Sequence, residues 1–394
     1  MAEVSFHNTR LAFADKSNFE LLRAKWLFRF VSVPFLVKVS SIKIRIAIKL
    51  GIPVSWALKP TVFKHFCGGE DINACDSVIA KLGKSRVKTI LDYAAEGRES
   101  EAEFDNTTAQ IIATVGKAST NTDIPFAVFK PSGVARVALL EKVQAQKPLS
   151  REEVKEFERV KARFAEICTK ASEARIPVMI DAEESWIQDA VDSLAEENIF
   201  LHNKELPLVF TTLQMYRTDR LDYLKSLHAR AKAAGVIIGV KLVRGAYMEK
   251  ERARAIQEGY PSPILPDKAA TDLSFDQAVH YCLAHAEEIA VSIATHNEKS
   301  CMLAIEACAD LGIAPNHPGV SFSQLLGMSD NISYNLAAEG YAVTKYVPFG
   351  AVKTVVPYLI RRAEENTSVG GQTSRELQLI LTELERRKRE DKKR

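Results

Sequence analysis

The chain has 394 residues, enough for one large core plus an appendage, and 46% hydrophobic with 26% charged residues is the composition of a globular protein. Its 53 basic and 50 acidic residues leave a formal net charge of only +3. Charges this evenly balanced do not suggest a nucleic acid as a partner, so any electrostatic preference must be local.

The six cysteines show no CxxC pair and no metal-ligand spacing with histidine. We therefore expect no metal site and interpret the cysteines as buried free thiols of a reducing compartment. The N-terminus has neither a secretory apolar region nor the Arg- and Ser-rich, acid-poor composition of a transit peptide. The expected location is the cytoplasm, with the inner face of the cytoplasmic membrane as a peripheral alternative.

Residues 26–49 are strongly apolar, yet they carry five positive charges and no negative one. Their longest uncharged run, residues 30–37, is far shorter than the roughly 20 residues of a membrane-spanning helix. The simpler interpretation is an amphipathic helix pair that covers the rest of the fold. The alternative is a basic, apolar surface that lies on an anionic membrane.

Further along the chain, short apolar runs alternate with longer segments of helical composition, which is typical of parallel strands with crossover helices. An upstream run after a Gly-Lys-Ser turn signal completes a possible set of eight. The predicted strands are residues 87–93, 126–130, 178–181, 208–214, 237–243, 291–295, 320–323 and 342–347.

Polar residues lie at or just past the C-terminal edges of the seven downstream strands, and the upstream run also ends in polar residues. A doubly wound sheet would give the same alternation, but no GxGxxG follows a predicted strand and no GxxxxGK[ST] occurs. Polar residues at many strand ends, rather than at one switch point, favour a (β/α)8 barrel with its site at the C-terminal mouth. These residues are Lys130, Asp181, Gln214, Arg244, His296, Gln324 and Tyr346.

We thus expect an α/β fold in which an α-helical region (residues 1–85) packs on a (β/α)8 barrel (residues 86–385), followed by a charged tail (residues 386–394). Ser150 and Glu153 have the spacing of a capping box, which predicts a helix start there.

The end of the strand at residues 237–243 carries two cations, Lys241 and Arg244, followed by Gly245. Cations at this position can place positive charge beside an anionic cofactor, and glycine allows a close backbone approach. A surface salt-bridge site is the alternative. A lysine inside an apolar strand is costly unless it is paired, so we expect Lys241 to face a polar interior or a ligand.

Near the C-terminus, Tyr358, Arg361, Arg362 and Glu365 have the spacing of one helical face, with Pro357 expected near the first turn. Two adjacent guanidinium groups on such a face can clamp a carboxylate. Solvated helix charges are the ordinary explanation for an Arg-Arg pair, and the pattern alone favours it.

Two further strand ends carry groups that could act in chemistry. Asp181 can hold Lys130 or an arginine in place, or accept a proton. His296 can donate a hydrogen bond to a cofactor, although a lone histidine is more often structural or exposed.

Nine motifs in this order resemble the proline dehydrogenase family, with matches from about residue 90 to residue 366. They read ILDYAAEG, FAVFK, IDAEES, TTLQMY, KLVRGAYMEKER, ATHN, QLLGM, YVPFG and PYLIRRAEEN. The resemblance implies a distorted (β/α)8 barrel that binds FAD noncovalently, oxidises L-proline to Δ1-pyrroline-5-carboxylate and passes electrons to a quinone. It also implies a monofunctional, mitochondrial-type enzyme, in which Lys241 stands where the long bifunctional bacterial proteins have an arginine near flavin N5.

The resemblance also assigns individual residues. The substrate pocket is matched by Lys130, Asp181, Tyr247, Leu325, Tyr346, Arg361 and Arg362. The surroundings of the flavin are matched by Gln214, Lys241, Val243, Arg244, Gly245, Ala246, Thr295, His296 and Glu365.

Three other functions stay open at this point. Tyr346 resembles the residue that discriminates against 4-hydroxyproline, so a hydroxyproline dehydrogenase is the nearest alternative. A Schiff-base aldolase could use Lys130 or Lys241. A proline-responsive sensor without activity is the non-enzymatic alternative.

Overall fold

The computed structural model describes residues 4–94, 96–368 and 372–392. The side chains of residues 364–368 and 372–373 lie outside the described part. All six cysteines are free and buried, as expected. Among the described helices, none combines the length and the apolar character needed to cross a bilayer.

Eight parallel strands form a closed barrel in the order of the chain, which confirms the predicted fold class. The first strand has the predicted bounds, and the others differ from the prediction by one or two residues at either end. The strands are β1 (Val87–Tyr93), β2 (Phe126–Phe129), β3 (Val178–Ile180), β4 (Val209–Gln214), β5 (Ile238–Val243), β6 (Ile289–Ala294), β7 (Val320–Leu325) and β8 (Val343–Phe349).

By their packing the residues form two compact units, Ile90–Ser323 and Met1–Thr89 with Gln324–Arg394. The predicted domain boundaries stay a prediction. In the first unit, strand register brings the ends of neighbouring strands level; Gln214 of β4, for example, pairs with Val243 of β5. Aligned ends place the polar residues that follow them at one mouth.

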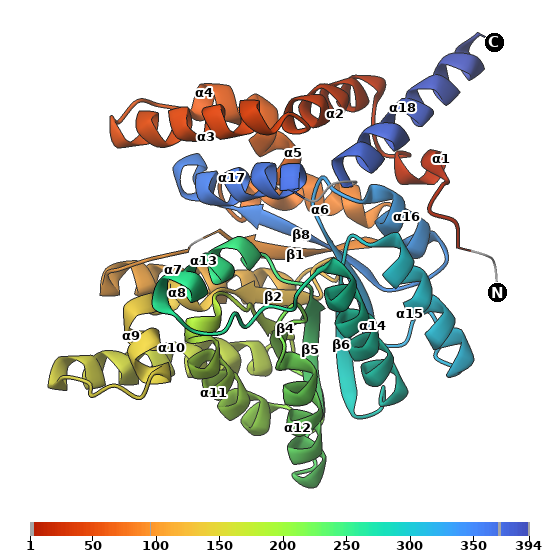
Figure 1. Ribbon diagram of the computed structural model, residues 1–394. Helices are drawn as coiled ribbons and strands as arrows, with labels where there is room; N and C mark the ends of the chain where they lie inside the picture. Colours follow the sequence, from red (N-terminus) through yellow and green to blue (C-terminus); the bar gives the residue numbers. More distant parts are fainter. Residues whose placement is uncertain (1–3, 95, 369–371, 393–394) are drawn as a thin grey trace. The chain divides into compact units, whose positions relative to one another are not determined.

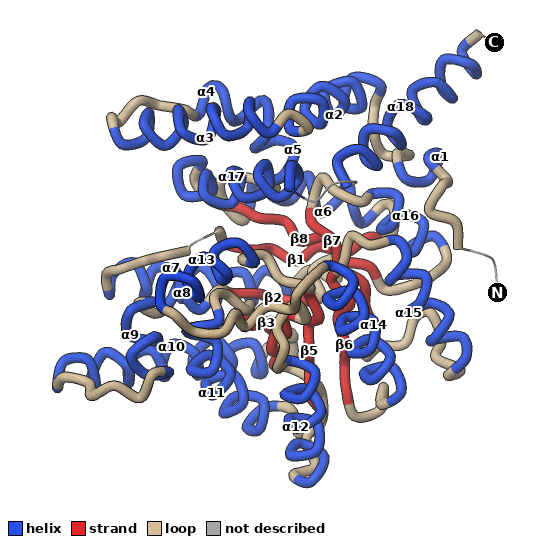
Figure 2. The backbone as a smooth tube through the Cα atoms, viewed as in Figure 1, coloured by secondary structure: helices blue, strands red, loops and turns tan. Residues whose placement is uncertain are grey.

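The helices of the Ile90–Ser323 unit cover its strands; α11 and α12, for instance, pack on β4 (Figure 2). The predicted capping box is present, since Ser150 Oγ accepts a hydrogen bond from Glu153 N and the Glu153 side chain accepts one from Ser150 N. The helices are α7 (Glu101–Ser119), α8 (Pro131–Val134), α9 (Val137–Gln144), α10 (Arg151–Glu173), α11 (Ser185–His202), α12 (Arg220–Ala233), α13 (Met248–Glu258), α14 (Lys268–Ala284) and α15 (Glu298–Asp310).

In the other unit the predicted N-terminal helix pair is present as α2 and α3, which pack against α17 and α18 (Figure 1). A core that includes Phe13, Phe28 and Ile380 joins α2 to α18. The main helices are α1 (Thr9–Ala12), α2 (Asn18–Val31), α3 (Pro34–Lys49), α4 (Ser55–Leu58), α5 (Lys64–Phe66), α6 (Asp76–Gly83), α16 (Asp330–Ala338), α17 (Val352–Ser368) and α18 (Gln372–Asp391).

The helix that carries the arginine pair begins earlier than the position of Pro357 suggested. Pro357 lies inside α17 rather than in its first turn, because the helix begins at Val352, directly after the Gly350–Ala351 turn. Proline is most easily read as a helix start since it lacks the N–H that an interior position uses. The spacing of Tyr358, Arg361 and Arg362 along the helix is unaffected.

Candidate active site

Four charged side chains of alternating sign form a buried array at the ends of β1, β2, β3 and β5. Lys130 Nζ lies 2.6 Å from Asp92 Oδ2 and 3.5 Å from Asp181 Oδ2. The second carboxylate oxygen of Asp181 accepts a hydrogen bond from Lys241 Nζ. Glu96, after β1, lies 4.0 Å from Lys130 Nζ. Each lysine is thereby held between or beside carboxylates, as the cost of burying a charge requires.

The two lysines of the array differ in their electrostatics. Burial opposes the charge of Lys130, but the carboxylates of Asp92, Asp181 and Glu96 outweigh it and raise the pKa of this ammonium. Lys130 is therefore a fixed cation and not a base. For Lys241, burial outweighs the attraction of Asp181 and lowers its pKa.

A further buried carboxylate, that of Glu183, orders the loops beside this array. Glu183 accepts hydrogen bonds from the backbone N–H of Ser132 at 2.7 Å and from its hydroxyl at 2.6 Å. The Gln214 side-chain amide at the end of β4 donates to the Glu183 carbonyl oxygen at 3.0 Å. Burial, with the nearby charge of Glu96, raises the pKa of Glu183 to about 7. Gln214 is thus oriented by the loop after β3.

Arg244, just after β5, is anchored on three sides. Its guanidinium donates to Asp272 Oδ1 at 2.6 Å, to Thr295 Oγ1 at 2.6 Å and to Ser300 Oγ at 2.8 Å. It also stacks over the Phe275 ring, 4.4 Å from the centroid. Thr295 and Arg244, both predicted to surround a flavin, are therefore brought together, and the guanidinium keeps one orientation.

The structure explains the glycine of the KLVRGAY motif by a packing contact that the sequence did not reveal. Gly245 has φ of +132°, and a Cβ there would lie 2.5 Å from the Tyr216 ring. The close approach is thus made to a buried tyrosine. Around it, Val243 ends β5, Ala246 is exposed, and Tyr247 is partly exposed before α13. His296 follows Thr295 after β6 and is partly exposed.

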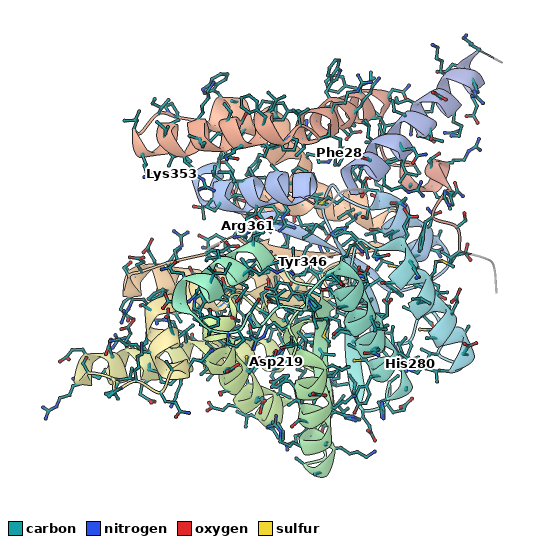
Figure 3. The ribbon with its side chains drawn as sticks, in the orientation of Figure 1. Phe28, Asp219, His280, Tyr346, Lys353 and Arg361 are labelled. Atoms are coloured by element: carbon teal, nitrogen blue, oxygen red, sulfur yellow. The ribbon has the colours of Figure 1, made fainter. Side chains whose placement is uncertain are left out.

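The remaining predicted residues belong to the other compact unit. Tyr346 on β8 is buried, and its carbonyl oxygen accepts a hydrogen bond of 2.9 Å from Leu326 N, directly after Leu325. Arg361 and Arg362 are partly exposed on α17, with Arg361 above Tyr346 in Figure 3.

Two residues of the predicted helical face lie together, because the Arg362 guanidinium lies 5.3 Å from the centroid of the Tyr358 ring. The Glu365 side chain, predicted at the flavin, lies outside the described residues.

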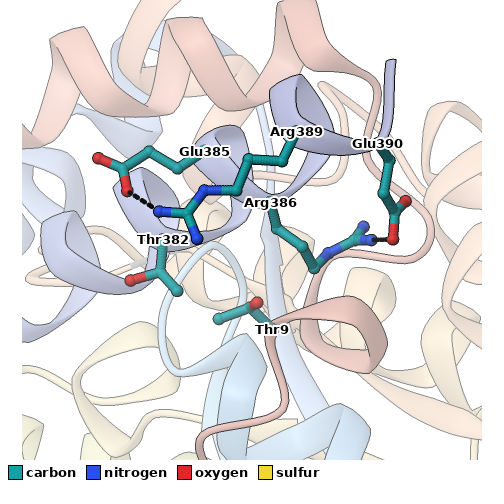
Figure 4. Close-up of a pocket in the computed structure, with 6 residues that line it drawn as sticks. All are labelled: Thr9, Thr382, Glu385, Arg386, Arg389 and Glu390. Atoms are coloured by element: carbon teal, nitrogen blue, oxygen red, sulfur yellow. Dashed lines mark ion pairs between the residues drawn. The ribbon is translucent and has the colours of Figure 1, made fainter. Parts of the chain in front are cut away.

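A surface hollow of about 320 Å³ lies between α1 and α18 (Figure 4). Arg386 lies 2.7 Å from Glu390 and Arg389 lies 3.8 Å from Glu385, so the arginines face glutamates of their own helix. None of the residues that line the hollow is at a strand end. We assign it no ligand.

Sequence reasoning missed Asp92, Glu96 and Glu183 as members of the site. All three belong to motifs that the sequence displays, and Asp92 is a carboxylate in an apolar strand, just before its end. A buried charge in an apolar strand was treated as a signal for Lys241, and the same rule applied to β1 would have found Asp92.

A closed barrel of eight parallel strands, with a buried array of cations and carboxylates where the strands end, defines an enzyme of the (β/α)8-barrel class. The family model described as Proline dehydrogenase matches residues 75–375. The chain belongs to the proline dehydrogenase family and is an oxidoreductase.

Named relatives agree with this assignment. Proline dehydrogenase 1, mitochondrial, of Dictyostelium discoideum is 30% identical over 96% of this chain and 74% of that protein. Hydroxyproline dehydrogenase of Xenopus laevis is 30% identical over 96% of this chain and 90% of that protein.

A solved structure supports the fold. Proline utilization A from Bdellovibrio bacteriovorus, inactivated by N-propargylglycine, superimposes with a TM-score of 0.72 at 21% identity. The match covers 94% of this chain but only 40% of that one.

Proposed function

We propose that this chain is a flavoenzyme that oxidises L-proline to Δ1-pyrroline-5-carboxylate. A flavin and proline follow from the family, and FAD, bound noncovalently, is the form we propose. The observation that carries the proposal is the buried array of Asp92, Lys130, Asp181 and Lys241, which concentrates fixed charge at the mouth of the barrel.

The residues present fit a flavin. A flavin ring accepts hydrogen bonds along one edge and gains negative charge on reduction, so its site needs donors and cations. The ends of β4, β5 and β6 supply the Gln214 amide, the Lys241 ammonium, the Arg244 guanidinium and the Thr295 hydroxyl. Thr212, two residues before Gln214 on β4, has a buried hydroxyl without a hydrogen-bond partner among the described residues.

In the proposed complex the substrate carboxylate binds Arg361 and Arg362, and the proline ring packs on Tyr346 and Leu325. Lys130 and Asp181 form the organising ion pair. When bound, the flavin supplies the acceptor for the hydride that leaves proline C5. The chain orients the substrate and keeps charge fixed around it, which is where much of the rate enhancement of such enzymes originates.

A purified, loaded protein should therefore be yellow and should reduce a dye acceptor when L-proline is added. A Schiff-base aldolase would instead be colourless and would be trapped on its substrate by borohydride. The carboxylates around Lys130 raise the pKa of its ammonium and oppose the neutral amine that Schiff-base chemistry needs. Burial lowers the pKa of Lys241, so the borohydride experiment tests the aldolase alternative at that lysine.

Overall similarity does not separate proline from hydroxyproline as the substrate, because relatives of both kinds match over 96% of this chain. The bulk of Tyr346 favours proline, since a smaller residue leaves space for the ring hydroxyl. We expect Tyr346→Ser to raise kcat/KM for 4-hydroxyproline relative to proline by about tenfold. Steady-state kinetics with both substrates measures this ratio, and an unchanged ratio would remove Tyr346 from the ring pocket.

The electron acceptor we propose is a quinone in the membrane, reached through α2 and α3. Opposite its buried side, α2 exposes a stripe that includes Trp26, 66% exposed, and α3 exposes a stripe that includes Phe35, 72% exposed. Helical spacing places Phe19, Leu22, Trp26 and Phe30 on one face of α2, and Phe35, Ile42 and Ile46 on one face of α3.

The charge of the same helices supports a bilayer with anionic headgroups as the partner of this surface. Lys38, Arg45 and Lys49 flank the apolar stripe of α3, and residues 26–49 contain no acidic residue. Apolar side chains beside cations are typical of helices that lie in the membrane interface. A second copy of this basic surface would be repelled by it.

Vesicle co-sedimentation tests this contact. The loaded protein should bind vesicles with phosphatidylglycerol more strongly than vesicles of phosphatidylcholine alone, and the double variant Trp26→Ser, Phe35→Ser should lose most of this binding. Leu201→Ser is the matched control, since Leu201 on α11 is 65% exposed outside this surface. Equal binding by the double variant and the control, or dimerisation through these helices instead, would refute the membrane contact. The cytoplasmic location stays a prediction.

A further inference from the structure

The loop between β7 and α16 is held by a fully buried lysine. Lys345 Nζ donates to the carbonyl oxygens of Leu325, at 3.3 Å, and of Met328. The same ammonium lies 2.9 Å from Asp330 Oδ1 at the start of α16. One cation therefore fixes both ends of residues 325–330.

Segments from both ends of the chain contact the same loop. Lys16, between α1 and α2, forms a largely buried ion pair with Asp330 Oδ2. Glu376 of α18 accepts a hydrogen bond from Ser329 N. His65 Nε2 lies 2.9 Å from the Gly327 carbonyl oxygen. The loop is thus connected to three segments that are remote in sequence.

The loop needs such support because its backbone is unfavourable by itself. Ser329, a residue with a Cβ, has φ of +51°, and Gly327 has φ of +79°. Left-handed conformations at non-glycine residues persist only when their surroundings enforce them. At Gly327 a Cβ would lie 2.5 Å from the His65 carbonyl oxygen, so the loop has no room for a side chain at this position.

The fixed loop carries one wall of the substrate-ring pocket in the proposed function. Leu325 is the residue whose carbonyl Lys345 binds, and Leu326 N donates to the carbonyl oxygen of Tyr346. Tyr346 is also the direct neighbour of Lys345 on β8, and alternation along a strand directs the two side chains to opposite faces. A shift of Lys345 would therefore move both Leu325 and Tyr346.

We propose that Lys345, Asp330 and Lys16 are positioning residues that set the separation of Leu325 and Tyr346, so that the N-terminal segment controls which ring substituents the enzyme accepts. Buried ion pairs are not generally more stabilising than apolar residues of similar volume. Fixed geometry is therefore the better explanation for a fully buried Lys345 and a largely buried Lys16. The proposal rests on the proposed function for its substrate, but not for its loop.

The test compares Lys16→Met with Arg10→Met. Both residues lie in the N-terminal segment, and each forms an ion pair with a residue far along the chain. The pair of Lys16 is largely buried, whereas Arg10 pairs with Glu390 at the surface. We expect Lys16→Met to raise the KM for proline about tenfold. The ratio of kcat/KM for proline to kcat/KM for 4-hydroxyproline should fall by about tenfold as well, and kcat for proline should change less than about threefold. Arg10→Met should leave all three values unchanged, and Lys16→Arg should restore most of the preference.

Hydrogen exchange supplies a readout that does not need activity. The amides of residues 326–329 should exchange faster in Lys16→Met than in Arg10→Met, because the loop opens more often. Lys345→Met should give the larger effect on exchange and KM; if it does not fold, Lys16→Met decides the question. Wild-type exchange and wild-type substrate preference in Lys16→Met would overturn the proposal. A wild-type protein that does not oxidise proline would instead refute the proposed function. The hydrogen-exchange result would then test only whether Lys16 holds the loop in place.

Discussion

Lys130 contacts three carboxylates, and this single residue decides whether the charged array is stable. Replacing it with methionine would leave Asp92 and Asp181 buried without their shared cation. We expect Lys130→Met to lower the free energy of unfolding by about 3 kcal/mol, since removing one partner of a buried pair leaves an uncompensated charge. Denaturant unfolding measures this difference.

Lys170→Met is the control, because Lys170 forms an exposed ion pair with Glu173 and exposed pairs contribute less than about 1 kcal/mol. Equal losses in the two variants would show that the array is not a tightly buried network.

Arg361 is expected to act on substrate binding alone. A charged hydrogen bond is worth about 1.5–3 kcal/mol, so Arg361→Met should raise the KM for proline roughly tenfold to hundredfold while the flavin stays bound. Lys353→Met, at an exposed position on the same helix (Figure 3), should leave KM unchanged. An unchanged KM in Arg361→Met would remove the carboxylate clamp.

The sequence predicted the residues whose chemistry is unusual for their position, such as Lys241 in an apolar strand and Asp181 at a strand end. It did not predict which partners they find, because a pair such as Lys130 and Asp92 is separated by 38 residues and meets only through strand register. The role of Gly245 could not be predicted for the same reason, because a glycine is required there by the ring of Tyr216, which is remote in sequence.

At the level of elements, seven of the eight strands were predictable because apolar runs and polar ends recur with the period of a βα unit. The first strand, β1, needed the family resemblance as well, because periodicity alone did not establish it. Pro357 shows where local rules fail, since an interior proline in α17 imitates a helix start. The helix pair α2 and α3 was predictable from its charge and hydrophobicity. Its packing on α17 and α18 was not, because those helices lie about 300 residues further along the chain.

The contact between α5 and the loop after β7 gives a prediction about pH. His65 packs edge-on against Phe28 and Phe66, and burial, with the nearby charge of Lys16, lowers its pKa to about 3. Because the histidine pKa is lower in the folded chain than in the unfolded chain, the unfolded chain binds the extra proton between about pH 6.5 and pH 3. The contribution of His65 to stability is therefore complete above pH 6.5 and is lost as the pH falls.

Denaturant unfolding as a function of pH measures this effect. The wild type should lose roughly 1 kcal/mol per pH unit below pH 6 through this group, and His65→Asn should show a correspondingly smaller dependence. His280→Asn, at an exposed position, should retain the wild-type dependence. If the free energy of unfolding of His65→Asn had the same pH dependence as that of the wild type, His65 would bind its proton equally in the folded and the unfolded chain, and its pKa would not be lowered by folding.

At the scale of the whole molecule, the chain divides into two compact units that carry different parts of the proposed function. The Ile90–Ser323 unit carries the charged array and the donors proposed for the flavin, and the other unit carries the arginine pair, Tyr346 and the exposed helix pair. The composition of the chain indicated only a balanced globular protein. The residues proposed to function lie at the strand ends, where charge is concentrated locally. The net charge of the chain cannot reveal such a local concentration.

The most direct test is reduction of the bound flavin by substrate. The purified, loaded protein is mixed anaerobically with L-proline, and the flavin absorbance near 450 nm is followed, with D-proline as the control. We predict bleaching by L-proline in proportion to the bound flavin, and formation of Δ1-pyrroline-5-carboxylate in the same amount. A loaded flavin that stays oxidised in excess L-proline would contradict the proposed activity.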